Sequence, residues 1–233
     1  MNKKLRLFFI VSCYLLVSIV LSSFLFTDYA VKTSANAIHK KPTIILDAGH
    51  GGEDSGATVK DVLEKDINLK IALKTKVLFE VNGFNVMLTR DSDSDTDGES
   101  EKFIKTSDLN NRVKLFNSSP DNIVISIHQN KFTETQYKGT QIFYSDNNEK
   151  SAVLAENIRK SVISLLQNEN TRECKKVSSD IYILDNSSVP SILVECGFLS
   201  NPEELKNLND DKYQTKFAYC LFLGFLEYYN VNY

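Results

Sequence analysis

One stretch constrains this chain more than any other. The β-branched, apolar residues 43–46 lead to Asp47, and the glycine-rich sequence Ala-Gly-His-Gly-Gly follows with His50 at its centre. This pattern predicts a buried strand that delivers Asp47 to its carboxyl end, where open α/β sheets bind their ligands. The glycines predict a sharp bend that lets another group approach His50 closely. We therefore expect a functional site to begin at this turn.

Four ionisable side chains stand at the ends of apolar or helical patterns: His50, Glu64, His128 and Glu195. The chain has only three histidines, and the third, His39, lies in a polar segment. Two neutral imidazoles and one carboxylate suit zinc, which keeps a fourth position for water in catalytic sites. A further carboxylate can then serve as general base. The pattern indicates a catalytic zinc site.

The residues by themselves do not decide between two candidate carboxylate ligands. Glu53 follows His50 by only three positions, and Glu64 begins a helical pattern; Glu53 can equally be a surface charge. The fourth ionisable residue, Glu195, ends the strongly apolar run 192–194. An unpaired acid buried there would be costly, so we expect Glu195 to line a cleft and to act in catalysis.

The first 27 residues form a predicted membrane segment. Three basic residues precede the uncharged apolar run 7–26, which has the ~20 residues needed to cross a bilayer. These charges predict a cytoplasmic amino terminus and export of the rest of the chain. The alternative is a signal peptide cleaved after Ala37, although secretory apolar regions are shorter. We expect an uncleaved anchor (1–27), a linker (28–42) and a catalytic domain (43–230).

Charge and cysteine usage exclude several other classes of function. The formal net charge of -3, without a basic block, argues against nucleic-acid binding. The four cysteines form no C-x-x-C pair and one lies in the membrane run, so we expect neither a disulfide framework nor a cysteine metal site. The acidic segment 92–106 copies the start of an EF-hand loop from Asp93, but Ile104 replaces the closing glutamate. We expect a solvated loop there and no calcium site.

Apolar runs alternate with helical patterns along the exported part of the chain. This alternation predicts a single three-layer α/β domain with a mostly parallel sheet flanked by helices. The expected strands are 43–47, 84–89, 123–127, 139–144, 181–184 and 191–195. The expected helices are 64–82, 108–117, 151–166, one that starts at 200–204 and one that covers 217–229.

Four blocks resemble the signature sequences of zinc-dependent N-acetylmuramoyl-L-alanine amidases of the type 3 family: 46–52, 63–66, 126–130 and 194–201. The blocks occur in the family's order, and the similarity runs from about Thr43 to Tyr229. The resemblance implies an α/β amidase that binds one zinc ion and cleaves the bond between N-acetylmuramic acid and L-alanine in peptidoglycan.

The resemblance also implies roles for individual residues. His50, Glu64 and His128 match the zinc ligands, which selects Glu64 over Glu53, and Glu195 matches the catalytic glutamate. A further residue of the third block, Asn130, is the expected substrate-binding residue. Gln129 and Lys131 replace the small residues that many relatives carry around it, and Cys196 follows the glutamate. These departures leave the chemistry intact and leave fine substrate preference open.

Within the family the chain looks most like the germination-specific cortex amidases of spore-forming bacteria. The membrane run joined to a bare catalytic domain, the acidic loop after Asp91 and the sequence Asn170-Thr171-Arg172 carry this likeness. It implies action in the forespore intermembrane space or cortex, where removing the stem peptide prepares muramic acid for conversion to muramic lactam by a separate deacetylase. No separate wall-binding module is visible, so we expect targeting to rest either on the anchor or on an accessory activating or targeting protein, and the sequence does not decide between them.

Two alternatives belong to other classes of function. One is a zinc peptidase that cuts within the stem peptide, which the identity of the freed amine would distinguish. The other is a membrane-tethered wall-binding protein with a dead site. Loss of a ligand or of the catalytic glutamate would mark the second, and all four residues are present.

Overall fold

The computed structural model describes residues 41–96, 103–177 and 179–233, together with 2, 3, 5, 6, 8, 12–20 and 22 near the amino terminus. The chain divides into two units, Met1–Lys40 and Lys41–Tyr233. In the first unit residues 12–20 are helical. A search of the described residues finds no helix with the length and apolarity to cross a bilayer. The predicted run 7–26, the linker 28–42 with His39, and Ala37 lie partly or wholly outside the described residues.

A six-stranded sheet forms the middle of the second unit. Its strands are β1 (Thr43–Ala48), β4 (Asn85–Leu88), β5 (Asn122–Asn130), β6 (Gln141–Tyr144), β7 (Lys175–Lys176) and β8 (Ser191–Phe198). They lie in the order β4-β1-β5-β8-β6-β7. The first four run parallel to one another, whereas β6 is antiparallel to β8 and parallel to β7. The sheet is therefore mixed, with one antiparallel pair, and the predicted α/β class is confirmed.

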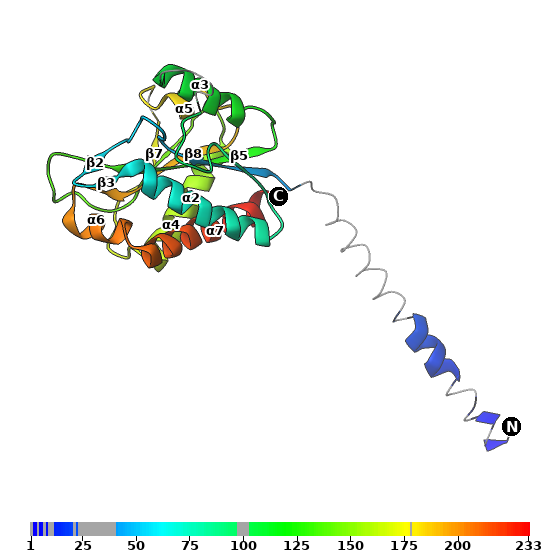
Figure 1. Cartoon of the computed structure of the whole chain (residues 1–233). Coiled ribbons are helices and arrows are strands. Elements are labelled where there is room, and N and C mark those ends of the chain that lie inside the picture. The colour runs from blue at the N-terminus through cyan, green and yellow to red at the C-terminus, as the bar shows by residue number, and fades with distance from the viewer. Residues whose placement is uncertain are drawn as a thin grey trace. The chain divides into compact units, whose positions relative to one another are not determined.

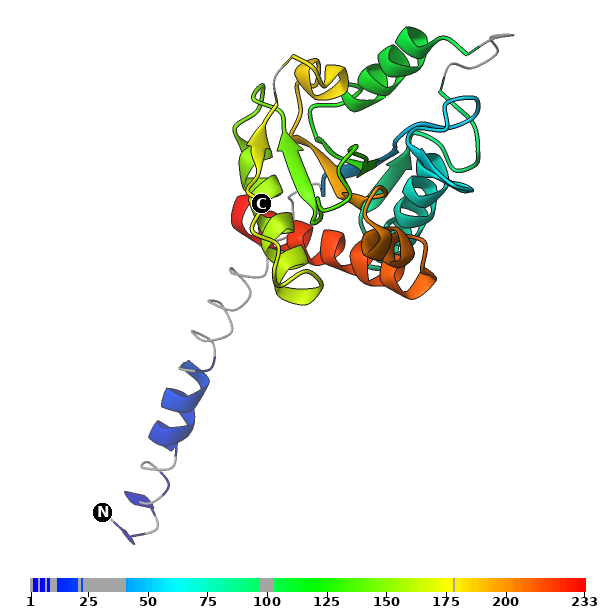
Figure 2. The same ribbon diagram turned by 90° about the vertical axis from the view of Figure 1, so that its left-hand side faces the viewer.

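Helices cover both faces of the sheet (Figure 1). The helices are α2 (Glu64–Val81), α3 (Lys105–Phe116), α4 (Lys150–Leu165), α5 (Tyr182–Asp185), α6 (Pro202–Leu208) and α7 (Asp211–Asn232). The larger core joins α2, α4 and α7 to one face of the sheet, and a smaller core joins α3 and α5 to the other. Figure 2 shows the sheet between these layers, with α3 and α5 above it and α4 and α7 below.

The alternating side chains of β1 supply both cores. Ile44 and Leu46 face the larger core, and Ile45 faces the smaller one, as the period of a strand requires. On the larger side, Phe79 of α2 packs edge to face against Phe225 of α7 with ring centroids 4.8 Å apart. This packing fixes α2 against the sheet, and the first residue of α2 is one of the four ionisable residues singled out above.

A short hairpin that the sequence patterns did not reveal leads into α2. Its strands are β2 (Thr58–Val59) and β3 (Val62–Leu63), which pair antiparallel. The backbone N–H of Glu64 donates to the carbonyl of Ala57 at 2.9 Å, so the hairpin satisfies part of the helix start that no side chain caps. The hairpin therefore sets where α2 begins.

The predicted strand at 181–184 is wrong, because Ile181 caps helix α5 and residues 182–185 form it. Four apolar residues are too few for periodicity to separate a strand from a helix. The neighbours Ile183 and Leu184 are both buried in the smaller core, an arrangement that a strand with alternating faces cannot make. The N–H groups of Leu184 and Asp185 both donate to the carbonyl of Ile181, which closes the turn.

Two other helices begin a few residues earlier than the sequence patterns predicted. Helix α3 begins at Lys105 rather than Asp108, and α7 begins at Asp211, six residues before the predicted Phe217. The side chain of Asp210 accepts from the N–H of Tyr213 and so caps α7 before its apolar part begins. Strand β7 was not predicted, since its two lysines carry no apolar pattern. For α7 the boundary shifts because a capping side chain, rather than the first apolar residue, marks the helix start.

Candidate metal centre

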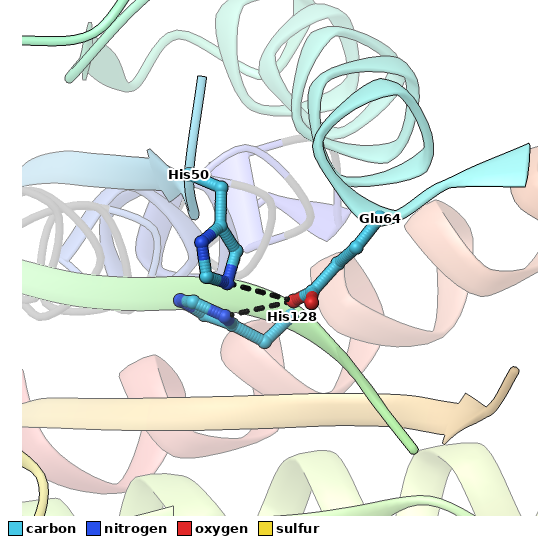
Figure 3. A group of neighbouring side chains, drawn as sticks. All are labelled: His50, Glu64 and His128. Atoms are coloured by element: carbon cyan, nitrogen blue, oxygen red, sulfur yellow. Dashed lines mark hydrogen bonds and ion pairs between the residues drawn. The ribbon is translucent and has the colours of Figure 1, made fainter. Parts of the chain in front are cut away.

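Three side chains from separate segments converge at the carboxyl end of the parallel strands (Figure 3). His50 follows β1, Glu64 is the first residue of α2, and His128 lies on β5. The Nε2 atom of His50 and the Nδ1 atom of His128 lie 3.3 and 3.0 Å from the same Glu64 oxygen, Oε1. One potential ligand atom from each residue lies within 4.8 Å of the others. Two imidazoles and a carboxylate thus face one point.

Glycines make room for this convergence. A Cβ atom at Gly49 would come within 2.2 Å of the His128 ring, and one at Gly56 within 2.6 Å of a Glu64 oxygen. His50 has a φ of 61°, which places a non-glycine residue in the left-handed region. The close approach predicted at this turn is therefore the approach of the His128 ring to Gly49.

The donor set fits zinc. Ligand atoms at the usual zinc distances and tetrahedral angles lie about 3.3 Å apart, close to the spacings between Glu64 Oε1 and the two imidazole nitrogens. The facing atoms are imidazole nitrogens and a carboxylate oxygen, the donors that catalytic zinc sites use with one position left for water. We therefore treat His50, Glu64 and His128 as the residues that would hold the ion.

The Glu64 carboxylate is fixed from several sides. Its Oε2 atom accepts from the N–H of Ala57 at 2.8 Å, and its Oε1 atom accepts from the N–H of Gln129 at 3.0 Å and from Asn68 Nδ2 at 3.3 Å. Burial by itself raises the pKa of Glu64, but the contacts with His128 and His50 outweigh it and hold the pKa well below its usual range. The carboxylate is thus ionised and aimed at the cluster.

A second carboxylate orients His50. The Nδ1 atom of His50 lies 2.7 Å from Asp54 Oδ2. This contact occupies Nδ1 and leaves the Nε2 atom of His50 facing Glu64. Burial lowers the pKa of His50, but the hydrogen bonds to Asp54 and Glu64 raise it to about 9. The same contact with His50 lowers the pKa of Asp54 to about 2. A carboxylate behind an imidazole is a common feature of zinc sites, and the sequence patterns did not reveal this one.

Glu195 lies beside the cluster on β8. It is opposite His128 in the parallel register of β5 and β8. Its Oε2 atom is shielded from solvent and has no hydrogen-bond partner among the described residues. The pKa of Glu195 is raised to about 7, mainly by burial. The charge of Glu64 also raises this pKa, and the nearby His128 lowers it. The arrangement therefore leaves one buried carboxylate oxygen free beside two imidazoles.

The other predicted residues have different surroundings. Glu53 is exposed and is not part of the cluster, which supports Glu64 as the ligand on geometric grounds. Asn130 is half-buried, and its Oδ1 atom accepts from the N–H of Lys131 at 2.8 Å. His128 and Glu195 were expected at strand ends, but both lie inside strands that continue for two or three more residues. The β-bulge after His128 marks where the register changes.

Asp47, which was expected to be delivered to the site, belongs to a separate ionic network beneath it. It is fully buried, and its Oδ1 atom lies 2.6 Å from Arg112 Nη1. Its oxygens also accept from Thr89 at 2.8 Å and from Ser126 at 2.5 Å. Burial raises the pKa of Asp47, but the charge of Arg112, the next largest influence, helps to hold it below its ordinary value. All these contacts make Asp47 a structural residue.

Two arginines hold the backbone of the glycine-rich turn. Arg112 donates to the carbonyls of Ala48 at 3.0 Å and His50 at 2.9 Å, and Arg90 donates to the carbonyls of Ala48 at 2.9 Å and Gly49 at 3.1 Å. The sequence patterns missed both arginines. The one local signal was the spacing of Asp108 and Arg112, four residues apart on a helix, which pair at 2.9 Å.

The acidic segment also contributes to the turn. Asp93 accepts from the N–H of Gly52 at 3.0 Å through one oxygen and from Lys65 Nζ at 2.7 Å through the other. Both oxygens of the first EF-hand-like position therefore bind this protein's own groups. Residues 97–102, which include the fifth and sixth positions of that motif, lie outside the described part of the chain.

Comparison with known proteins gives a consistent result. The family model described as N-acetylmuramoyl-L-alanine amidase matches residues 44–226. The germination-specific N-acetylmuramoyl-L-alanine amidase of Bacillus subtilis (strain 168) is 38% identical over 189 residues, covering 80% of this chain and 79% of that protein. The range matched by the family model includes all four residues of the site.

Solved structures agree with this match. The CwlD amidase from Clostridioides difficile, determined in complex with the GerS lipoprotein, has a TM-score of 0.77 and 41% identity, and covers 82% of this chain and 100% of that one. The N-acetylmuramoyl-L-alanine amidase from Clostridium difficile 630 has a TM-score of 0.73 and 28% identity, with 84% and 100% covered. The match therefore extends from the signature blocks to the arrangement of the whole second unit. This chain belongs to the N-acetylmuramoyl-L-alanine amidase family.

Proposed function

We propose that this protein hydrolyses the amide bond between the lactyl group of N-acetylmuramic acid and L-alanine of the peptidoglycan stem peptide, with one zinc ion held by His50, Glu64 and His128. One observation carries the proposal. An imidazole nitrogen from each histidine faces Glu64 Oε1, and Glu195 lies opposite His128 with a buried oxygen that has no partner in the described part of the chain. Membership in the amidase family supplies the bond that is cut.

Different residues of the chain transfer protons and orient the metal ligands. Zinc in a site of this kind lowers the pKa of a bound water towards ~7 and polarises the scissile carbonyl. Glu195 accepts the proton of the attacking water and returns a proton to the departing amine of L-alanine. Asp54 keeps His50 turned so that its Nε2 atom faces the cluster. The buried surroundings of Glu195 suit proton exchange near neutral pH, because they raise its pKa to about 7.

The substrate we propose is the spore cortex. The Bacillus subtilis relative is named a germination-specific amidase, and the Clostridioides difficile structure is that of the amidase CwlD. Removal of the stem peptide there would prepare muramic acid for conversion to muramic lactam and so contribute to germination competence. A strain that lacks this protein should build cortex without muramic lactam, whereas loss of a vegetative wall enzyme would leave the lactam in place.

Mass spectrometry of muropeptides tests the reaction itself. Purified protein with zinc is incubated with cortex peptidoglycan, and the freed amine is identified. An amine on L-alanine, with intact N-acetylmuramic acid, is the expected result. An amine on a residue further along the stem would support the peptidase alternative. No cleavage by a protein that carries stoichiometric zinc would support the dead wall-binding protein.

We further propose that the protein acts outside the cytoplasm, anchored by residues 7–26. Three basic residues before this apolar run favour that orientation, and peptidoglycan lies on that side of the membrane. Membrane fractions should contain a protein that begins at or near Met1. Amino-terminal sequencing that finds Ile38 first would show cleavage after Ala37. CwlD was solved with a lipoprotein, and we propose an accessory partner of that kind here, detectable by co-purification from membranes.

A further inference from the structure

A polar groove of about 880 Å³ lies at the same end of the sheet as the metal centre. Its walls come from residues 136–138 and 166–172 and from Glu203, Glu204, Asn207 and Tyr213. Because β6 runs antiparallel to β8, the start of β6 lies beside the end of β8, and Gln141 is opposite Glu195 in their register. Thr140 Oγ1 donates to the carbonyl of Cys196 at 2.8 Å, which fixes that junction. The groove therefore lies beside the end of β8, the strand that carries Glu195.

Side-chain hydrogen bonds build the wall formed by residues 166–172. Asn170 Nδ2 donates to the carbonyl of Thr140 at 3.0 Å and to Gln167 Oε1 at 3.1 Å, and Gln167 Oε1 also accepts from the N–H of Thr140 at 2.8 Å. Gly139, with a φ of 91°, lies so close that a Cβ atom there would come within 2.7 Å of Asn170 Oδ1. The segment that carries Asn170, Thr171 and Arg172 is therefore held firmly against the start of β6.

Arg172 is fixed by three contacts on this wall. Its backbone N–H donates to Asn170 Oδ1 at 3.0 Å, and its Nε atom donates to the carbonyl of Lys138 at 2.9 Å. Its guanidinium carbon lies 4.7 Å from the centroid of the Phe198 ring. These contacts orient the planar group without using its outer nitrogens. In the described part of the chain, neither Nη atom of Arg172 has a hydrogen-bond or ion-pair partner.

The neighbouring acids are occupied or exposed. Glu204, the buried acid of the groove, accepts from the N–H of Phe198 at 2.7 Å and from the N–H of Gly139 at 2.8 Å, one through each oxygen. Glu169 is exposed and lies 4.0 Å from Lys138 Nζ. The two Nη groups of Arg172 thus present an oriented fork of donors, the geometry that binds a carboxylate through two hydrogen bonds.

We infer that Arg172 binds a free carboxylate of the stem peptide and so positions the substrate in the groove. The inference rests on the proposed function. Phe198, under the guanidinium, lies three residues from Glu195 along β8, or about 10 Å at the rise of a strand. An extended peptide covers that distance in about three residues, so the carboxylate lies beyond L-alanine. Binding at such a remote point stabilises the bound substrate and the transition state alike, so it lowers KM and leaves kcat largely unchanged.

The test compares two proteins on two substrates. Wild type and Arg172→Gln are assayed on muropeptides whose stem carboxylates are either free or amidated. For wild type, amidation should raise KM about 10- to 100-fold, the range that loss of charge-assisted hydrogen bonds gives. Arg172→Gln should show the same rise in KM on the free-acid substrate, a largely unchanged kcat, and no further rise on the amidated one. The exposed Lys206→Ala in α6 serves as the charge-matched control and should behave like wild type.

The outcomes separate this inference from the proposed function. Wild type that releases no L-alanine amine from either substrate would refute the proposed function. Wild type that cleaves both substrates equally well, or an Arg172→Gln penalty of the same size on both, would refute the carboxylate site while the amidase function stands. The comparison of two substrates within one variant also cancels any loss of folded protein, which a purely structural Arg172 would produce.

Discussion

Two clusters of buried charge meet at the turn after β1, and they differ in how fully their polar atoms are used. Beneath the turn, Asp47 contacts Arg112, Thr89 and Ser126, and Arg112 contacts Asp108 and two backbone carbonyls. Above it, His50, Glu64 and His128 point at one another, and Glu195 keeps a shielded oxygen without a partner among the described residues. The charged groups of the first cluster have their partners within the protein, whereas the second cluster keeps polar atoms that can bind a further group.

The difference indicates how to separate structural from functional charges. A buried ion whose hydrogen bonds are satisfied within the protein stabilises the fold only while every partner is present. A buried group that lacks a partner is tolerated where a ligand or the reaction uses it. The lower network therefore supports the turn, and the polar atoms of the upper cluster are available for the metal ion and the substrate that we propose.

The largest expected effect follows removal of one metal ligand. His128→Ala should bind almost no zinc and lose activity with it, because the remaining imidazole and carboxylate leave the ion with too few protein ligands. Zinc content by atomic absorption, beside turnover, checks this. His39→Ala removes a histidine of the predicted linker and should keep one zinc per chain. A His128→Ala protein with stoichiometric zinc would place the metal elsewhere.

The next effect separates proton transfer from metal binding. Glu195→Gln keeps the volume of the side chain but cannot act as a base, so turnover should fall by about 10²- to 10⁴-fold. Zinc content and melting temperature should stay near those of wild type. Near-normal turnover would contradict the mechanism. A lower melting temperature with normal turnover of the folded fraction would make Glu195 a structural residue like Asp47.

Breaking the lower network should affect stability. Arg112→Ala leaves Asp47 buried without its partner, which should cost about 3–5 kcal/mol of unfolding free energy. The control is Arg159→Ala, which removes a partly exposed pair with Glu156 and should cost about 0–1 kcal/mol. Urea unfolding of both variants gives the comparison. Equal losses in the two variants would show that the network adds nothing beyond an ordinary surface pair.

The two clusters should also differ in their response to pH. Burial raises the pKa of Glu195 from 4.5 to about 7, so in chelator-treated protein its contribution to stability is lost as pH rises through this window. The pKa of Asp47 is lowered from 3.8, so its contribution is present above that value and is lost as pH falls below it. Urea midpoints from pH 4.5 to 7 should decline less in Glu195→Gln than in wild type. Parallel curves would contradict the assignment.

The smallest expected effect is that of calcium. Asp93 already contacts Lys65 and the N–H of Gly52, and Ile104 occupies the position of the closing glutamate of an EF-hand loop. Millimolar calcium should therefore leave melting temperature and activity unchanged in wild type. A calcium-dependent rise in melting temperature that disappears in Asp93→Ala would overturn this expectation.

Local patterns determined the class of the fold and the residues to watch. The apolar run before Asp47, the glycines around His50 and the alternation of strands and helices are short-range features, and they predicted the α/β class correctly. The scarcity of histidine singled out His50 and His128. In the structure one ring nitrogen of each faces the same carboxylate oxygen of Glu64. Such features are visible in a sequence because backbone bending and burial depend on neighbouring residues.

Tertiary structure decided which of these residues meet. Asp47 looked like a site residue, but Arg112, 65 positions away, binds it beneath the turn. The short apolar run at α5 is helical because Ile183 and Leu184 both pack into the smaller core. Arg172 is oriented by its contacts with the carbonyl of Lys138 and the ring of Phe198. Contacts between distant segments depend on packing of the whole chain, and no local spacing records them. The sequence by itself therefore determined the chemical groups available, and folding determined which charges were paired and which were left to act.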